Sequence, residues 1–314
     1  MKLQQLRYLS EVARRDLSVS AAAEALHTSQ PGVSRQVKEL EDELGVQIFV
    51  RHGKRLTAIT EPGRAVLAIA ERILAEAANL KRAGAEFANE KLGTLTVATT
   101  HTQARYALPK AVAALKRRYP DVQLVIHQGS PTQICEMVLR GEADFAIATE
   151  QIAEYAELVS LPCYQWNRCI VVPSRHPLTR AKPLTLEAIA RHPIVTYDFA
   201  FANRSLVEKA FEHRGLAPRV VLTALDADVI KTYVALGLGV GIMAAMAFDR
   251  KRDRGLIALD AAHLFESSTT RLGIKRGAYL RRYAYEFIEL FAPHLPRAIV
   301  EPIVRGASGT RYEL

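Results

Sequence analysis

The sequence predicts a mixed α/β protein in which a small, mainly helical domain precedes a larger region of alternating strands and helices. Residues 3–44 carry apolar side chains at helical spacing, interrupted by residues that cap helices. A longer stretch with the same spacing follows Thr60. After Gly93, short runs of β-branched residues alternate with helical stretches. This alternation is the pattern of an α/β fold.

The composition is that of an ordinary globular protein. Of 314 residues, 49% are hydrophobic and 24% are charged, and the chain is long enough for two or three domains. No uncharged apolar run reaches the roughly 18 residues of a membrane span, and no apolar signal core follows Lys2. Cys135, Cys163 and Cys169 form no CxxC motif. We therefore expect reduced thiols in a cytoplasmic protein that has no membrane contact.

The net charge of +9 does not locate a nucleic-acid surface by itself. Residues 1–90 hold thirteen basic and twelve acidic side chains, so the basic excess lies downstream, where it indicates a solvated surface. A local cluster near the front of the chain is more informative. Its members are Arg35, Lys38, Arg51, Lys54 and Arg55.

Three helices and a hairpin are predicted at the front of the chain. In order, they cover residues 3–15, Ser18–Leu26, Thr28 or Ser29 to Leu44, and the strands Gln47–Arg51 and Leu56–Ile59. The hydroxyls of Ser18 and of Thr28 or Ser29 can cap the second and third helices, and Gly45 can end the third. The sequence His52-Gly53-Lys54 provides the turn between the strands.

The third helix has two chemically different faces. Apolar residues would pack the second and third helices together and against the first: Ala22, Leu26, Val33, Val37 and Leu40. Glutamine and arginine can read base edges in a major groove, while serine and lysine suit phosphates, which the helix N-terminus also favours. The layout indicates a winged helix-turn-helix that binds DNA, and a small bundle with a solvated polar face is the alternative. The candidate DNA-binding residues are Thr28, Ser29, Gln30, Ser34, Arg35 and Lys38 on the helix and Arg51, Lys54 and Arg55 on the hairpin.

A long helix follows, with Thr60 as its cap and Pro62 in its first turn. Its apolar residues recur every three or four positions: Val66, Ile69, Ile73, Ala77, Leu80, Gly84 and Phe87. This seam fits either packing on its own domain or pairing with a second copy. Pairing is favoured because DNA readers of this type use two-fold symmetry to span paired half-sites.

Polar residues follow the predicted strands of the larger region. Strands are expected at Thr94–Thr99, Asp144–Ala148 and Ile194–Thr196, and Thr100, Thr102, Gln103 and Thr149 come directly after the first two. Ligands of α/β sheets bind beyond the carboxyl ends of strands. Hydroxyls, amides and helix N-termini there suit a small anion without requiring a cationic side chain. Taken alone, Thr100 has an alternative role as a helix cap.

Several long motifs resemble those of LysR-type transcriptional regulators, and within that family those of the CysB/Cbl-like group. They are TSQPGVSRQVKELEDELGVQIFVRHGKRLT (28–57), ATTHTQARYALP (98–109), HQGSPTQ (127–133), ADFAIATE (143–150), LPCYQWNR (161–168) and DADVIKTYVALGLGVGI (226–242). The match runs almost from end to end, and motifs of this length are far more specific than a generic helix-turn-helix.

The resemblance implies a division of the chain into three parts. These are a winged helix-turn-helix at 1–60, a dimerising linker helix at 61–90, and an effector-binding module at 91–314 that is similar to type 2 periplasmic binding proteins. The module would hold two α/β subdomains, the first at about 91–162 and 267–304 and the second at about 163–266, with crossings near Pro162 and Glu266.

The resemblance also implies which residues bind the effector. Thr100, Thr102, Gln103 and Thr149 match the family's site position by position, and Trp166 would border it. One departure concerns an FTGRS-type segment of the relatives, which here reads Phe201-Ala202-Asn203-Arg204-Ser205. Ala202 supplies no hydroxyl, so Asn203 or a water replaces that contact, or the ligand preference has shifted.

The implied function is that of a DNA-binding transcriptional regulator, not an enzyme, with no cofactor. It would activate sulfate assimilation and cysteine biosynthesis genes under control of acetylserine, sulfate or thiosulfate, or alternatively regulate sulfonate use. The expected partners are double-stranded DNA, RNA polymerase and further copies of the chain, as a homotetramer built from two dimers. A solute-binding protein and an enzyme for an acylated amino acid are disfavoured by the DNA-reading stretch and by the lack of a catalytic signature.

Gly237–Gly241 follows a helix and precedes a strand, the wrong order for a dinucleotide loop.

Overall fold

The computed structural model describes residues 1–53, 55–88, 92–198 and 204–306. Three residues with predicted roles, Lys54, Ala202 and Asn203, lie outside these ranges. The chain divides into two compact units, Met1–Phe87 and Ala88–Leu314. Among the described residues, no helix is both long and apolar enough to span a membrane.

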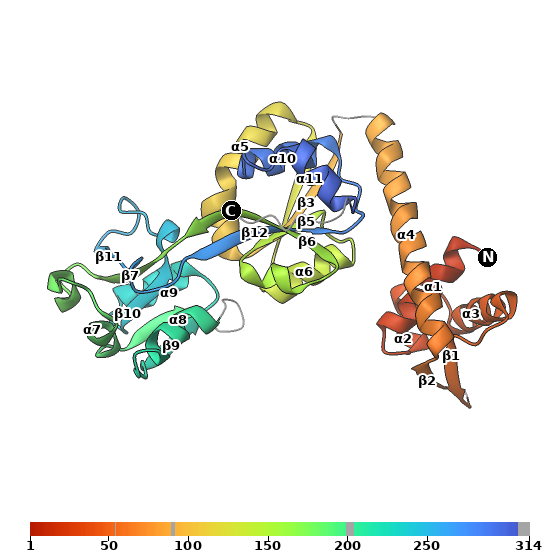
Figure 1. Cartoon of the computed structure of the whole chain (residues 1–314), viewed down its shortest axis with the longest axis horizontal. Helices are drawn as coiled ribbons and strands as arrows, with labels where there is room; N and C mark the ends of the chain where they lie inside the picture. The colour runs from red at the N-terminus through yellow and green to blue at the C-terminus, as the bar shows by residue number, and fades with distance from the viewer. Residues whose placement is uncertain (54, 89–91, 199–203, 307–314) are drawn as a thin grey trace. The chain divides into compact units, whose positions relative to one another are not determined.

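The first unit is a three-helix domain with a hairpin and a long C-terminal helix (Figure 1). Its elements are α1 (Leu3–Arg14), α2 (Val19–Ala25), α3 (Gln30–Leu44), β1 (Phe49–His52), β2 (Arg55–Ile59) and α4 (Glu61–Ala88). Ser18 caps α2 by accepting a hydrogen bond from the Ala21 amide at 3.2 Å. Ser29, not Thr28, caps α3, and Gly45 ends it in the left-handed region at φ 68°. The predicted winged helix-turn-helix is therefore present.

The core of this unit is small and continuous. Leu9, Val33 and Leu40 are fully buried where α1 meets α3, and Ala22 is fully buried on α2. The absence of a larger side chain at Ala22 lets α2 and α3 cross closely. The polar face of α3 therefore points away from a well-packed apolar interior.

A buried carboxylate ties α3 to the hairpin. Glu41 is 6% exposed, and its Oε1 accepts hydrogen bonds from the amides of Ile48 at 2.8 Å and Phe49 at 3.1 Å. Its Oε2 pairs with the guanidinium of Arg51 on β1. A buried charge is tolerated only when several partners compensate it, and here the partners also fix where the hairpin leaves the helix.

The first part of the long helix α4 packs on this domain, and its last part extends beyond it. Thr60 caps it by accepting a hydrogen bond from the Gly63 amide at 2.9 Å. A Cβ at Gly63 would lie 2.2 Å from the Ile48 carbonyl oxygen, so only glycine allows this close approach. Leu67 is buried against the domain, whereas Phe87 near the far end of α4 is 89% exposed. The first part of α4 therefore packs on its own domain, and pairing of its far end with a second copy stays a prediction.

The second unit contains two five-stranded sheets, each flanked by helices (Figure 1). The first sheet has the order β4-β3-β5-β12-β6, with bounds Val122–Gln128, Gly93–Thr99, Phe145–Ala148, Ser268–Lys275 and Leu158–Trp166. The second has the order β11-β7-β10-β8-β9, with bounds Leu256–Asp260, Arg168–Pro173, Val240–Ala244, Ile194–Tyr197 and Val220–Ala224. We call the two halves subdomain I and subdomain II.

Helices cover both faces of each sheet. In subdomain I, α5 (Leu108–Arg118) and α10 (Arg282–Phe291) pack on one face and α6 (Pro131–Leu139) on the other. In subdomain II, α7 (Leu186–Ala190) and α8 (Arg204–Glu212) lie on one face and α9 (Ala227–Ala235) on the other. A π-helical turn, η1 (Gln103–Ala107), precedes α5, and α11 (Arg297–Val304) completes the core of subdomain I.

The chain crosses between the subdomains twice. β6 leads into β7 through Asn167, and residues 261–267 lead from β11 back to β12. β6 remains paired with β12 up to Trp166, which pairs with Ser268, so the first crossing lies beyond the expected Pro162. The Arg168 side chain is buried at the crossings and donates hydrogen bonds to the Glu266 carbonyl at 3.1 Å and to Ser268 Oγ at 3.0 Å.

All three cysteines are buried free thiols. Burial raises the pKa of Cys135, Cys163 and Cys169 to about 12 in each case. Since the thiolate is the reactive form, these thiols are unreactive in the folded protein.

Replacing Glu41 by Ala should destabilise the first unit by about 2–4 kcal/mol, because two buried amides and Arg51 lose their acceptor. Hydrogen exchange measured by mass spectrometry should show faster exchange at Ile48 and Phe49. Glu39→Ala is the matched control, since Glu39 is exposed and its contacts are with the side chains of Arg35 and Gln36 on the same helix. Equal protection in both variants would contradict the role of Glu41.

Candidate nucleic-acid interface and ligand pocket

Helix α3 presents a polar face to solvent. Gln30, Arg35 and Lys38 are exposed and Ser34 is half-buried, while Val33 and Val37 of the same helix are buried. The N-terminus of α3 is open at Ser29, which is also exposed. Thr28 precedes this cap and is half-buried. The structure therefore gathers the six candidates of the helix on its solvent side or at its N-terminal end.

The basic side chains of this region differ in how far their charge is already compensated. Arg35 pairs loosely with Glu39 at 3.3 Å, and both side chains are well exposed. Arg51 is more firmly engaged, because it pairs with the buried Glu41. Arg55 begins β2 and is exposed. The anchoring role of Glu41 was not predicted, since the sequence shows only one acidic residue among four on that helix.

A cavity of about 530 Å³ lies between the subdomains of the second unit. The structure brings five of the six predicted effector residues to its wall: Thr100, Thr102, Gln103, Thr149 and Trp166. The remaining lining residues are His101, Gln128, Gly129, Gln133, Arg168, Tyr197, Leu225, Asp226, Ala244 and Ser268. The sixth predicted residue, Ala202, lies outside the described residues.

The fold explains why these residues meet. β3 ends at Thr99, β5 at Ala148 and β8 at Tyr197, so the carboxyl ends of strands from both sheets open onto the cavity. Helix N-termini lie at the same wall, since α6 follows Gly129 and α9 follows Asp226. Such ends offer free backbone N–H groups and a favourable dipole to an anion.

Some polar residues of the wall are already bonded within the protein. The amide of Gln103 donates to Thr270 Oγ1 at 3.0 Å and accepts a hydrogen bond from the hydroxyl of Tyr164. Burial raises the pKa of Tyr197 to about 12, although hydrogen bonds from Thr102 and from the Ala244 amide lower it. Tyr197 is therefore a neutral phenol at physiological pH, and Gln103 is held in one orientation.

Other groups at the cavity have unused hydrogen-bonding capacity. His101 Nδ1 and Trp166 Nε1 are buried, and neither has a hydrogen-bond partner among the described residues. The indole can only donate, whereas the imidazole nitrogen donates or accepts according to its tautomer. Both atoms are closed off from solvent in this arrangement of the wall, so a ligand would reach them only if the wall rearranged.

The cavity also contains charges that the sequence analysis missed. Arg168 lies over the Trp166 ring, with 5.2 Å from its Cζ to the ring centroid, and supplies a cation. Asp226 supplies a carboxylate, whose Oδ1 accepts a hydrogen bond from the Val229 amide as the cap of α9. The signal for Arg168 was present, because it ends the LPCYQWNR motif two residues after Trp166.

His101, Asp226 and Asp228 place one potential metal ligand each within 4.8 Å of one another. However, Asp228 already pairs with Arg105 at 2.7 Å and with Lys231 at 3.2 Å. Two cations beside one carboxylate disfavour a divalent metal ion at this place. The group is better described as part of an ion-pair cluster.

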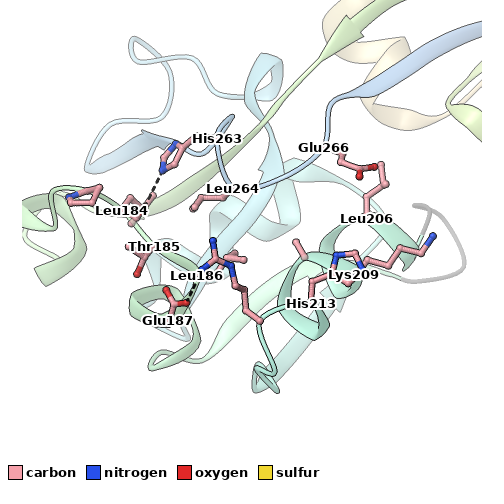
Figure 2. Close-up of a pocket in the computed structure, with 13 residues that line it drawn as sticks. Leu184, Thr185, Leu186, Glu187, Leu206, Lys209, His213, His263, Leu264 and Glu266 are labelled. Atoms are coloured by element: carbon pink, nitrogen blue, oxygen red, sulfur yellow. Dashed lines mark hydrogen bonds and ion pairs between the residues drawn. The ribbon is translucent and has the colours of Figure 1, made fainter.

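A second cavity, of about 410 Å³, lies within subdomain II. Figure 2 shows His263, bonded to the Leu184 carbonyl at 2.9 Å, on one side and Lys209 and His213 on the other. Its basic residues are balanced by carboxylates, since Arg214 lies 3.9 Å from Glu187 and Glu266 also lines the cavity. None of the described strands ends in its lining, so this cavity differs from the first one in that respect.

Comparison with known proteins identifies both units. The model of "Bacterial regulatory helix-turn-helix protein, lysR family" matches residues 3–64, and that of "LysR substrate binding domain" matches residues 88–296. The chain is 55% identical to the HTH-type transcriptional regulator CysB of Burkholderia cenocepacia over all 314 residues of both chains. It is 54% identical to the regulator SsuR of the same species over 98% of this chain and 100% of that one.

The second unit also resembles a solved structure. The cofactor-binding domain of the Cbl transcriptional regulator superposes with a TM-score of 0.67 and 43% identity, covering 69% of this chain and 96% of that domain. The two-subdomain arrangement is thus shared with a relative of substantial sequence similarity.

Proposed function

Because the chain belongs to the LysR family of bacterial transcriptional regulators, we propose that it activates sulfate assimilation and cysteine biosynthesis genes in response to a small anion bound between its subdomains. Like its relatives, the chain is a DNA-binding regulator and not an enzyme. The observation that carries the proposal is the cavity at the carboxyl ends of strands, lined by Thr100, Thr102, Gln103 and Thr149.

Two lines of support favour sulfur-containing or acetylated anions as ligands. The relatives with the highest identities quoted above match over nearly the whole chain, so the cavity and its surroundings are included in the similarity. Hydroxyls, an amide, helix N-termini and the buried Arg168 suit sulfate, thiosulfate or the carboxylate of an acetylserine. We assign acetylserine as inducer and sulfate-like anions as opposing ligands. Regulation of sulfonate use is a second candidate, favoured by the nearly equal identity to SsuR.

The proposed mechanism is a change in the closure of the two subdomains. A ligand shifts an equilibrium only to the extent that it binds one arrangement more tightly. The cavity is bounded by both subdomains, so a bound anion makes different contacts when they approach or separate. In an assembly of several copies, that change would alter the spacing of the DNA readers, and hence the bend of the promoter and its use by RNA polymerase.

Exposed apolar side chains support an assembly of several copies. Leu80 and Phe87 on α4 are 75% and 89% exposed, respectively. In subdomain II, the edge strand β9, helix α9 and the residues next to them expose a further group: Val220, Val221, Leu225, Val229, Tyr233 and Leu236. Two separate apolar surfaces fit a dimer of dimers, in which α4 pairs the readers to span half-sites about 34 Å apart.

Thr100→Val should weaken sulfate or thiosulfate binding by about tenfold or more, because a hydroxyl bonded to the anion is lost. The chain has one tryptophan, and Trp166 lines the cavity, so its fluorescence reports binding directly. Thr179→Val is the matched control, since its hydroxyl donates to the His176 carbonyl away from the cavity. An unchanged affinity in Thr100→Val would show that the anion binds elsewhere.

Arg35→Ala should weaken binding to a specific promoter by about 1–3 kcal/mol if Arg35 reads a base. Gel-shift titrations with specific and non-specific fragments at fixed salt measure this. Arg305→Ala removes an exposed arginine of the second unit and should leave DNA affinity unchanged. An equal loss of affinity for both fragments would show that Arg35 contacts a phosphate and not a base. If wild type retained no promoter fragment in a salt-sensitive way, the regulator proposal itself would fail.

Replacing Leu80 and Phe87 together by Glu should split the assembly, because two carboxylates on each α4 would be buried where the helices pair. Light scattering after gel filtration should then give a smaller molar mass than wild type. Lys81→Glu, a charge change at an exposed position between them, is the control. An unchanged mass in the double variant would show that α4 does not pair.

A further inference from the structure

Tyr106 connects the two subdomains beside the ligand cavity. It lies in η1 of subdomain I, yet its ring packs against the core of subdomain II, which includes Val171 and Ile230. Its hydroxyl donates a hydrogen bond to Asp228 Oδ1 at 2.8 Å and receives one from Lys231 Nζ at 3.2 Å. A side chain of one half is therefore inserted into the other half and bonded at its tip.

Charged groups surround this hydroxyl. Arg105, the neighbour of Tyr106, pairs with Asp228 Oδ2 at 2.7 Å. Lys231 is 7% exposed, and its ammonium also contacts Asp253 at 2.9 Å and the Ala247 carbonyl at 2.9 Å. We call Arg105, Tyr106, Asp228, Lys231 and Asp253 the Tyr106 cluster. Two residues come from subdomain I and three from subdomain II.

The cluster is charged but balanced. Burial alone would raise the pKa of Asp228, yet hydrogen bonds from Tyr106 and Lys231 and the nearby cations lower it. Burial would lower the pKa of Lys231, yet its bonds to Asp253, Tyr106 and Asp228 raise it. The contacts of Tyr106 with Asp228 and Lys231, and that of Arg105 with Asp228, exist only while the two subdomains are together, whereas Lys231 also pairs with Asp228 and Asp253 within subdomain II.

The two segments that carry four of the five cluster residues begin at the cavity wall. Thr100–Gln103 line the cavity and lead directly into η1, which carries Arg105 and Tyr106. Asp226 lines the cavity and caps α9, which carries Asp228 and Lys231. A π-helical turn is an uncommon element that often marks a functional position. On each side, about one turn of helix separates the cavity wall from the cluster.

We propose that the Tyr106 cluster is a latch between the subdomains, and that Tyr106 and Asp228 are positioning residues that set the affinity of the cavity for its effector. The effector part of this inference rests on the proposed function, in that the effector binds in the Thr100 cavity. A latch that forms in the closed arrangement and a ligand that binds the same arrangement stabilise each other. Weakening the latch lowers the fraction of molecules in the closed arrangement. The apparent affinity for the effector therefore falls.

Tyr106→Phe tests the latch, because it keeps the ring and removes only the hydroxyl. Tyr283→Phe is the matched control, since its hydroxyl donates to the Thr94 carbonyl at 2.9 Å within subdomain I. In the full-length protein, sulfate titration followed by Trp166 fluorescence should show about fivefold weaker binding in Tyr106→Phe and no change in Tyr283→Phe. Asp228→Asn should weaken binding in the same direction.

A second measurement separates a latch from ordinary packing and does not require a ligand. Hydrogen exchange in residues 261–267 of ligand-free Tyr106→Phe should be faster than in wild type, and saturating sulfate should restore protection. A lower melting temperature with unchanged sulfate affinity and unchanged exchange at 261–267 would overturn the latch. If wild type binds neither sulfate, thiosulfate nor acetylserine, the effector assignment fails instead. The exchange of ligand-free Tyr106→Phe then decides whether the latch exists.

Discussion

The double crossing of the chain between the two sheets is the constraint on which the second unit depends. β6 and β12 form one antiparallel ladder that ends at the Trp166–Ser268 pair, and beyond it each strand continues into the other subdomain. The two crossings therefore lie side by side and are held by the buried Arg168. Because the remaining strands of both sheets end toward this place, a cavity there is a consequence of the topology and not of any single residue.

Much of this architecture could be predicted from the sequence, because its signals are local. Helix caps such as Ser18 and Thr60, the glycine that ends α3, and the polar residues after strands are all recognised within a few positions. The same holds for Thr100 to Gln103, since a strand end followed by hydroxyls predicts a site without knowledge of the rest of the fold.

The residues that were missed act through partners on other elements of the fold. Glu41 fixes the hairpin through the amides of Ile48 and Phe49, Arg168 bonds to Ser268, and Tyr106 bonds to Asp228. In each case the residue type alone suggests only a solvated charge or an ordinary aromatic. What gives the side chain its role is a partner that the fold brings close. Buried charge thus marks the places where two segments must be held in one relative position.

The three buried thiols have a practical consequence for measuring motion in this protein. With a pKa of about 12 each, they leave almost no thiolate at neutral pH. A cysteine introduced on the surface would consequently be the dominant target of maleimide dyes or nitroxide spin labels in the otherwise native chain. One label on each subdomain would turn the distance between the two sheets into a spectroscopic observable, without first removing any native residue.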